Sequence, residues 1–248
     1  MRGWAGRPRW GLNHGGIMPH GKRFLAAQKE VTAEMYPLPE AVKLLKRLPP
    51  TKFDQSVELH LKLGIDSKQS DQNLRGAVSL PSGLGRSRKV VAFCPPETVE
   101  EAKKAGAVEA GSDDLVAKIQ GGWMEFDVAV AHPQMMQKVA KLGRVLGPQG
   151  KMPTPKAGTV GPDVAKLVKE FAAGKLEYRS DAGGNVHAVV GKMSFEESAL
   201  VENILALVEH IRRVKPASAK GQFFQKVVLS ATMMPGIGVD LKSLPLGV

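Results

Sequence analysis

Apolar and polar residues alternate along one segment in the first third of the chain. Over residues 54–65, apolar side chains occupy every second position from Val57 onward, which is the period of a strand with one buried and one exposed face. Ahead of it, apolar residues recur at helical spacing over 22–35 and 39–48, and a proline follows each of these predicted helices. A polar turn then leads to 75–81, which is predicted to be the partner strand.

The middle third has a different pattern of apolar residues, in which short apolar runs alternate with segments of helical periodicity. Strands are predicted over 90–94, 108–110 and 127–131, and helices over 96–105, 113–119 and 134–142. Ser112 stands where a cap of the second of these helices is expected. Such alternation is typical of a parallel, Rossmann-like sheet. No GxGxxG motif follows any of these strands, so a dinucleotide site is not expected.

The last third again shows the α+β pattern of the first third. The predicted elements are a helix over 162–173, strands over 176–180 and 186–190, a long helix ended by Pro216, and a strand over 223–233. The sequence DAGGN between the two short strands predicts a hairpin turn. Pro162 falls in the first turn of the first helix, and Ser194 and Glu197 form a capping box for the long one. A proline and two glycines are expected to break the last strand.

This contrast between the two ends and the middle predicts the domain organisation. The expected fold class is α/β and α+β. A split α+β domain made of 18–83 and 176–248 receives an inserted Rossmann-like α/β domain, 84–175. Residues 1–17 contain three arginines and no acidic residue. They are interpreted as a disordered basic extension or as the product of an upstream start codon.

Positive charge is in excess along this chain of 248 residues. There are 35 Lys and Arg against 24 Asp and Glu, giving a formal charge of +11 and a sequence pI near 9.8. This balance favours a polyanionic partner, nucleic acid before membrane, and the apolar fraction of 43% argues against disorder. No apolar run approaches the ~18 residues of a membrane span. Cys94 is the only cysteine, so no internal disulfide forms and a reducing compartment fits.

The segment 138–160, KVAKLGRVLGPQGKMPTPKAGTV, joins a helical pattern to a stretch rich in glycine, proline and lysine that contains no acidic residue. It is predicted to be a long loop that is ordered without being helix or strand. A phosphate-binding Walker loop is excluded, because Val145 stands where glycine is needed and Met152 where serine or threonine is needed. A surface crossover with solvated lysines and a basic loop near nucleic acid both remain open.

Local motifs for catalysis or metal binding are not recognisable. The histidines show no metal-ligand spacing with one another or with Cys94, so neither a metal nor a cofactor is expected. They are His14, His20, His60, His132, His187 and His210, and each is interpreted as an ordinary core or surface residue. No catalytic residue is predicted, and Cys94 is interpreted as a core residue. An enzyme that binds a nucleotide in the Rossmann-like insert remains as an alternative.

Four segments, in order, carry a family resemblance: LPPTKFDQSVELHLKLGIDSKQSDQNLRGAVSLPSGLGR, KLGRVLGPQGKMPTPKAGTV, GNVHAVVGKMSFEESALVENILALVEHI and KVVLSATMMPGIGVD. From about residue 18 to 240, the chain resembles the L-one family of bacterial large-subunit ribosomal proteins, which belong to the mobile stalk at the tRNA exit site. The resemblance implies that the domain built from both chain ends carries the main ribosomal RNA site. It implies binding and positioning, not bond chemistry.

Partners and location are also implied by the resemblance. The expected partners are the stalk region of 23S ribosomal RNA, the exit-site tRNA whose movement and release the family assists, and the messenger RNA of its own operon. The protein is expected to be cytoplasmic, to be part of the 50S subunit, to be monomeric when free and to have no membrane partner. A free-standing translational repressor is a further alternative.

The main RNA surface implied by the resemblance lies on the segments KFDQSVE and SATM. Its residues are Lys52, Phe53, Ser56, Glu58, Ser230, Thr232 and Met233. Hydroxyl groups can read 2′-hydroxyls, an aromatic ring can pack on a sugar or base, and a lysine can meet phosphate. Weaker candidates are Arg179, His187 and Lys192, and accessory RNA or tRNA contacts are expected from Lys141, Arg144, Lys151 and Lys156. Without the resemblance, Phe53 and Met233 would be assigned to core packing.

Two departures from the family pattern affect these expectations. Met234 stands where the family usually has glycine, and it is expected to crowd a close approach of RNA to the backbone. Ser56 stands where threonine is common, which keeps the hydroxyl. Either change is expected to weaken RNA affinity without threatening the fold.

Overall fold

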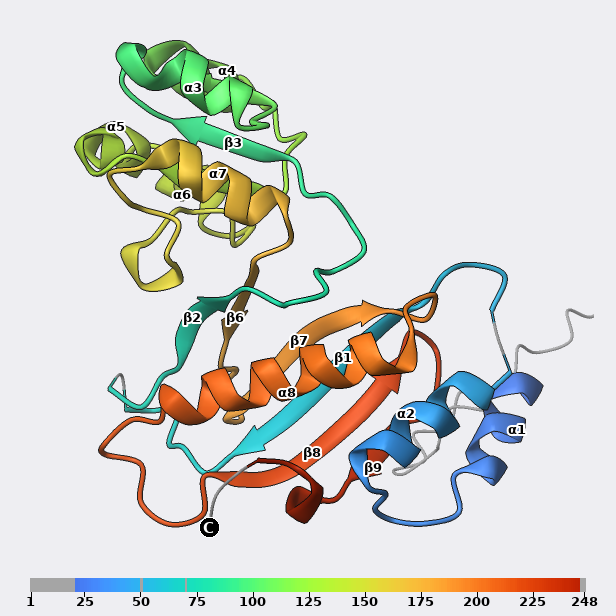
Figure 1. Cartoon of the computed structure of the whole chain (residues 1–248). Helices are drawn as coiled ribbons and strands as arrows, with labels where there is room; N and C mark the ends of the chain where they lie inside the picture. The colour runs from blue at the N-terminus through green and yellow to red at the C-terminus, as the bar shows by residue number, and fades with distance from the viewer. Residues whose placement is uncertain (1–20, 50, 70, 246–248) are drawn as a thin grey trace, which may run out of the picture.

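A four-stranded antiparallel sheet forms the centre of the lower lobe in Figure 1. The computed structural model describes residues 21–49, 51–69 and 71–245. The strands are β1 (Ser56–Leu63), β7 (Asn185–Lys192), β8 (Phe224–Ala231) and β9 (Ile237–Val239), in the order β7-β1-β8-β9. Side chains of β1 alternate between buried and partly exposed, as its sequence predicts. Its two neighbours, β7 and β8, both come from the last third of the chain.

Both ends of the chain contribute to the core of this lobe. Its helices are α1 (Lys22–Glu30), α2 (Leu38–Arg47) and α8 (Glu197–Arg213). α2 packs against α8 and β8, and α8 packs against β7 (Figure 1). The apolar stripe of α8 is fully buried because its members recur at helical spacing; they are Leu200, Ile204, Leu207, Val208 and Ile211. One cluster of buried side chains therefore draws on residues 27–84 and on residues 176–244.

The upper lobe is a parallel sheet covered by helices on both faces. Its strands are β3 (Val90–Phe93), β4 (Glu109–Gly111) and β5 (Val128–Ala131), in the order β4-β3-β5. Its helices are α3 (Val99–Lys104), α4 (Asp113–Gln120), α5 (Met136–Ala140), α6 (Gly143–Leu146) and α7 (Val164–Ala172). α3 and α7 share one buried cluster with β3, and α4, α5 and α6 share another. All four residues of β3 are buried, as expected for a central parallel strand.

A two-stranded ribbon lies between the lobes, where the chain leaves the lower lobe and returns to it (Figure 1). β2 (Arg75–Val78) pairs antiparallel with β6 (Leu176–Arg179), so that Val78 lies opposite Leu176. Short 3-10 helices complete the structure at Pro96–Thr98, Pro133–Met135, Pro155–Ala157 and Leu241–Ser243.

The buried side chain of Asn203 fixes the path of the chain beyond β2. Its oxygen accepts a hydrogen bond from the Ser82 N–H at 3.0 Å. Its nitrogen donates to the carbonyl oxygens of Gly83 at 3.0 Å and Val190 at 2.8 Å. Asn203 itself is 0% exposed. One side chain of α8 thus ties β7 to the segment that leads into the upper lobe.

The expected mixture of α and β structure is confirmed, and so is the parallel sheet in the middle third. The boundaries 18–83, 84–175 and 176–248 stay a prediction, and residues 1–17 lie outside the described residues. Within the described ranges, no helix is long and apolar enough to cross a membrane.

Two predicted strand pairings are wrong. The segment 75–81 does not pair with β1, because β7 and β8 already occupy both edges of β1; β2 pairs with β6 instead. The predicted hairpin of 176–180 and 186–190 is also wrong as a pairing. Its turn exists, since the Asp181 N–H donates to the Asn185 carbonyl at 2.8 Å, but only the bridge between Ser180 and Val186 joins the two strands. Beyond it they enter different sheets.

Of three predicted helix starts, two are wrong in detail and one is confirmed. Ser194 does not cap α8, because its hydroxyl donates to Asp54 Oδ2 at 3.0 Å and Glu196 takes the cap position. The prediction for α4 is confirmed, because Ser112 holds its cap position, although the Ser112 side chain makes no cap hydrogen bond. Pro162 precedes the cap of α7, which is Asp163; its carboxylate accepts from the Lys166 N–H at 3.0 Å.

The first helix is shorter than predicted, and one strand was missed. α1 ends at Glu30 because the Tyr36 hydroxyl accepts hydrogen bonds from the N–H groups of Thr32 and Ala33, which turns the chain.

The last glycine that was expected to break the final strand belongs to β9. A Cβ at Gly238 would lie 2.2 Å from the Glu34 carbonyl oxygen, so glycine is required there for close approach of two backbones. The loop expected over 138–160 also contains a helix, α6.

Replacing Asn203 with leucine should lower the free energy of unfolding by about 2 to 4 kcal/mol, because it leaves the Ser82 N–H and two carbonyl groups without their partner. Urea denaturation followed by circular dichroism measures this change. Glu202→Leu, at an exposed neighbouring position of α8, is the control and should stay within about 0.5 kcal/mol. Equal effects of the two substitutions would contradict the role given to Asn203.

Stability should also fall in mild acid because of His210 on α8. Burial lowers the pKa of His210 below its ordinary value of 6.5, and the charge of Arg213 lowers it further. The unfolded chain therefore binds this proton more readily, and stability is lost as the pH falls below about 6.5. Urea denaturation between about pH 7 and pH 5 should show this loss, and His210→Gln should reduce it. Identical pH profiles for the two proteins would refute it.

Candidate nucleic-acid interface

The face of the large sheet that does not pack on α2 and α8 carries a row of polar side chains. On β1 these are Ser56, Glu58, His60 and Lys62, which alternate with the buried leucines and valine. The antiparallel register places Ser230 of β8 opposite Glu58, and His187 of β7 opposite His60. Residues that are far apart in sequence are thus brought to one surface, which we call the open face.

At one end of the open face, two segments predicted to bind RNA are joined by hydrogen bonds. The Thr232 N–H donates to the Ser56 carbonyl at 3.1 Å. The Thr232 hydroxyl lies 3.3 Å from both the Ser56 nitrogen and its carbonyl oxygen. Gln55, only 2% exposed, donates its side-chain amide to the Thr232 carbonyl at 2.7 Å. The sheet therefore fixes the two segments against each other before any ligand binds.

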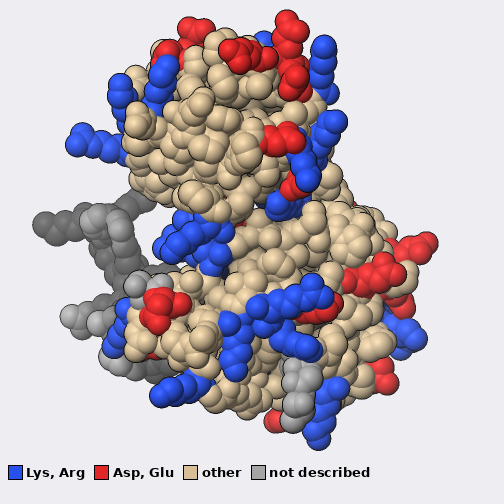
Figure 2. All heavy atoms as spheres, turned by 60° about the vertical axis from the view of Figure 1, so that its left-hand side comes forward, with Lys and Arg blue, Asp and Glu red and all other residues tan. Residues whose placement is uncertain are grey.

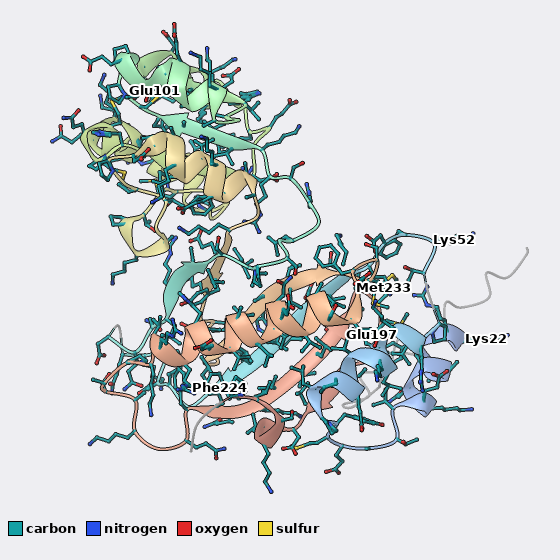
Figure 3. All side chains as sticks on the ribbon, viewed as in Figure 1. Lys22, Lys52, Glu101, Glu197, Phe224 and Met233 are labelled. Carbon is teal, nitrogen blue, oxygen red and sulfur yellow. The ribbon has the colours of Figure 1, made fainter. Side chains whose placement is uncertain are left out.

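Two large apolar side chains project from this end into solvent. Phe53 is 51% exposed and Met233 is 64% exposed, so the assignment to core packing that their composition alone suggested is wrong. Lys52 is also exposed, and Figure 3 places Lys52 and Met233 at the same end of the sheet. Exposed apolar groups beside a cation and two hydroxyls are suited to sugars, bases and phosphates.

The turn after β8 holds Met233 in an unusual backbone conformation. Its φ is +65°, and no other non-glycine residue in the described ranges has a positive φ. Such a conformation is costly for a residue with a side chain, and it is found preferentially at functional sites. It turns Met233 outward, whereas Met234 points inward and is 7% exposed within the core. The expectation that the Met234 side chain crowds the surface is therefore wrong.

His60 was interpreted as an ordinary histidine, but it stands at the middle of the open face. Its Nε2 lies 2.9 Å from the Ser230 hydroxyl, and its Nδ1 lies 2.8 Å from Nδ1 of His187. Burial lowers the pKa of His60, as does His187, while Glu58 at 3.9 Å opposes them. His60 therefore tends to be neutral and links β8 to β7. The alternating pattern of β1 could have indicated this position, because it places His60 in the same exposed row as Glu58.

Arg23 is a second residue that sequence analysis did not assign to the site. Its guanidinium Nη2 lies 3.9 Å from Met233 Sδ, so α1 contributes a cation beside the exposed methionine. Nothing in the helical pattern of 22–35 indicated this contact, because it depends on where α1 packs.

The three weaker candidates separate into two groups. Lys192 donates to the Ser56 hydroxyl at 2.9 Å and His187 contacts His60, so both belong to the open face. Nε2 of His187 also lies 3.5 Å from Asp181, whose pKa is lowered to about 2 by hydrogen bonds from the side chain and backbone of Asn185. Arg179 lies instead on β6, opposite Arg75 in the two-stranded ribbon.

The four basic candidates of the middle third also differ in their surroundings. Lys141 and Arg144 are exposed on the upper lobe. Lys151 is engaged within its own lobe, since its Nζ donates to the Met124 carbonyl at 3.1 Å and lies 4.9 Å from the Phe126 ring centre. Lys156 lines a cavity of about 420 Å³ together with Arg75 and Arg179. In Figure 2, Lys and Arg side chains border the hollow between the two lobes.

Other chemistry is sparse in the described part of the chain. Residues 21–49, 51–69 and 71–245 contain no group of three or more His, Cys, Asp or Glu side chains placed to hold a metal ion. Cys94 is fully buried, and burial raises the pKa of its thiol. This agrees with the prediction that Cys94 is a core residue.

Comparison with known proteins identifies the family. The sequence profile of the ribosomal protein L1p/L10e family matches residues 44–235. The large ribosomal subunit protein uL1 of Kosmotoga olearia is 52% identical over 220 residues, which cover 88% of this chain and 95% of that protein. The same-named proteins of Protochlamydia amoebophila and Chlamydia pneumoniae are 51% and 50% identical, covering 85% and 91% of this chain and 89% and 97% of their own lengths. The chain belongs to the ribosomal protein L1p/L10e family.

Proposed function

We propose that this chain is a structural constituent of the large ribosomal subunit and that it binds ribosomal RNA through the open face. The observation that carries this proposal is the end of the sheet, where exposed Phe53 and Met233 flank the Ser56 and Thr232 hydroxyls. The relatives are named as proteins of the large ribosomal subunit. Membership of a ribosomal protein family argues against the alternative of a nucleotide-binding enzyme.

The mechanism is recognition of RNA shape by a surface that is already ordered. Lys52 meets a phosphate, Phe53 packs on a sugar or base, and the hydroxyls of Ser56 and Thr232 read sugar edges. Ser230 and Glu58 offer further acceptors for 2′-hydroxyl or amino groups. Because the hydrogen bonds between Gln55, Ser56 and Thr232 exist without RNA, little ordering entropy is lost on binding.

The family resemblance supports a more specific assignment of partners. The RNA is the stalk region of 23S ribosomal RNA, and the same assembly assists the movement and release of deacylated tRNA at the exit site. A similar structure in the messenger RNA of its own operon makes the protein a translational repressor. The protein is monomeric when free, and it is cytoplasmic as part of the 50S subunit.

The two lobes are proposed to act as two domains with different tasks. The domain of residues 18–83 and 176–248 holds the main RNA site. The inserted domain, 84–175, makes accessory RNA or tRNA contacts through Lys141, Arg144 and Lys156, and the ribbon adds Arg179. Lys151 contributes less, because its Nζ is already engaged with Met124 and Phe126.

Removing the Phe53 ring or the Thr232 hydroxyl should weaken binding to a stalk-RNA fragment. We expect Phe53→Ala and Thr232→Ala each to cost ~1 to 3 kcal/mol of binding free energy with the fold retained, because each removes one specific contact. Filter binding at fixed salt gives the affinity. Thr232→Ser keeps the hydroxyl, and Val108→Ala alters an apolar side chain on the upper lobe that is 50% exposed. These controls should bind normally, and unchanged affinity in both alanine variants would refute the site.

Replacing 84–175 with a short glycine-serine linker should leave most of the RNA affinity. Val78 and Leu176 are paired neighbours, so the remaining ends lie close enough to be joined. The open face contains no residue of the deleted segment. We expect the affinity for the stalk-RNA fragment to stay within about tenfold, or ~1.4 kcal/mol, of the full chain. A collapse of binding by a protein that circular dichroism shows to be folded would move the site to the upper lobe.

A further inference from the structure

A second cavity, of about 350 Å³, lies where the open face meets the segment that leads into the upper lobe. Four parts of the chain line it: β1, β7, the segment after β2, and the residue that precedes β5. The lining residues are Ser56, Leu84, Arg86, Arg88, Asp127, Val189 and Lys192. We call it the junction cavity. Ser56 and Lys192 belong both to it and to the open face, so the two are continuous.

Positive charge exceeds negative charge in the junction cavity. Arg86, Arg88 and Lys192 face a single carboxylate, that of Asp127. One Asp127 oxygen accepts a hydrogen bond from the Lys89 N–H at 3.1 Å. The other lies 3.9 Å from Arg86 Nη2, a long contact for a side chain that is 73% exposed. Asp127 therefore offsets only part of the charge.

Arg88 is the least satisfied of these cations. It is half-buried, yet its guanidinium makes no hydrogen bond or ion pair with any residue of the described ranges. Burial lowers the pKa of Arg88, although the negative charges of Asp127 and Glu177 act in the opposite direction. The ionised form of Arg88 is therefore less favourable here than in water. A half-buried cation with five donors and no acceptor is stabilised by an anion that brings several oxygens.

We propose that the junction cavity binds a backbone phosphate of the same RNA that lies on the open face. Guanidinium groups match the geometry of phosphate oxygens, and Lys192 adds a third cation beside the Ser56 hydroxyl. The continuity of the cavity with the open face favours a phosphodiester of bound RNA over free phosphate. Because Ser56 and Arg88 line the same cavity, an RNA strand that contacts Ser56 would place a neighbouring phosphate beside Arg88. This inference rests on the proposed function and extends the RNA surface to Arg86 and Arg88.

The phosphate would touch the lower lobe, the connecting segment and the residue before β5 at the same time. Lys192 belongs to the lower lobe, Arg86 and Arg88 belong to the connecting segment, and Asp127 immediately precedes β5. RNA bound there would therefore favour one arrangement of the two lobes over others, because its affinity depends on the cavity staying closed around it.

The test is equilibrium binding of the full-length protein to a 23S stalk-RNA fragment across a salt series. We expect Arg86→Gln and Arg88→Gln each to reduce the slope of log affinity against log salt by about one, and the double variant to lose about fivefold in affinity at low salt. Lys89→Gln is the matched control, since Lys89 is exposed in the same segment and does not line the cavity; it should keep the wild-type slope. Arg88→Lys keeps the charge and should retain most of the slope.

Unchanged slopes in both arginine variants would overturn the inference. If Phe53→Ala and Thr232→Ala still weakened binding, the proposed function would survive that result; if they did not, both would fail. A calorimetric titration with inorganic phosphate distinguishes the source of the anion. One outcome would assign the cavity to free phosphate and overturn an RNA site. In that outcome Arg88→Gln abolishes the binding of inorganic phosphate, but the salt dependence of RNA affinity does not change. A fold check by urea denaturation accompanies each variant.

Discussion

The pairing of β1 with both β7 and β8 is the constraint on which the structure depends. It joins a strand from the first third of the chain to two strands from the last third, and it fills both edges of the central strand. Because these edges are occupied, β2 has to pair elsewhere, and the ribbon of β2 and β6 forms. The buried side chains from the two ends then merge into one core, which neither end could complete alone.

The same pairing builds the RNA surface that we propose. It sets Ser56 beside Thr232 and His60 beside Ser230 and His187, so the polar row crosses three strands. A sheet holds such side chains more firmly than separate loops would, and Gln55 adds a buried support behind Thr232. Met233 is the one non-glycine residue in the described part of the chain with a positive φ, and it lies where its side chain leaves the protein.

Periodicity in the sequence predicted the longer elements, but it missed β9 and α6 and could not predict which strands pair. The alternation in β1 and the apolar stripe of α8 are properties of single segments, so both were found. Strand pairing depends on competition between segments far apart, and the two wrong pairings arose there. Gly238 looked like a break because its contact with Glu34 is tertiary, and Arg23 was missed for the same reason. The family resemblance named Phe53 and Met233, but the structure was needed to show them exposed.

The long separation between β1 and its partners also has a consequence during synthesis. Val57 pairs with Ala231, which is translated 174 residues later. At about 5 to 20 residues per second, β1 waits roughly 10 to 35 seconds for that partner. The strands of the upper sheet, β3 to β5, fall within 90–131 and are complete much sooner. The alternating leucines of β1 therefore stay exposed on the nascent chain well after the upper sheet is complete, which makes this strand a segment that chaperones have to protect.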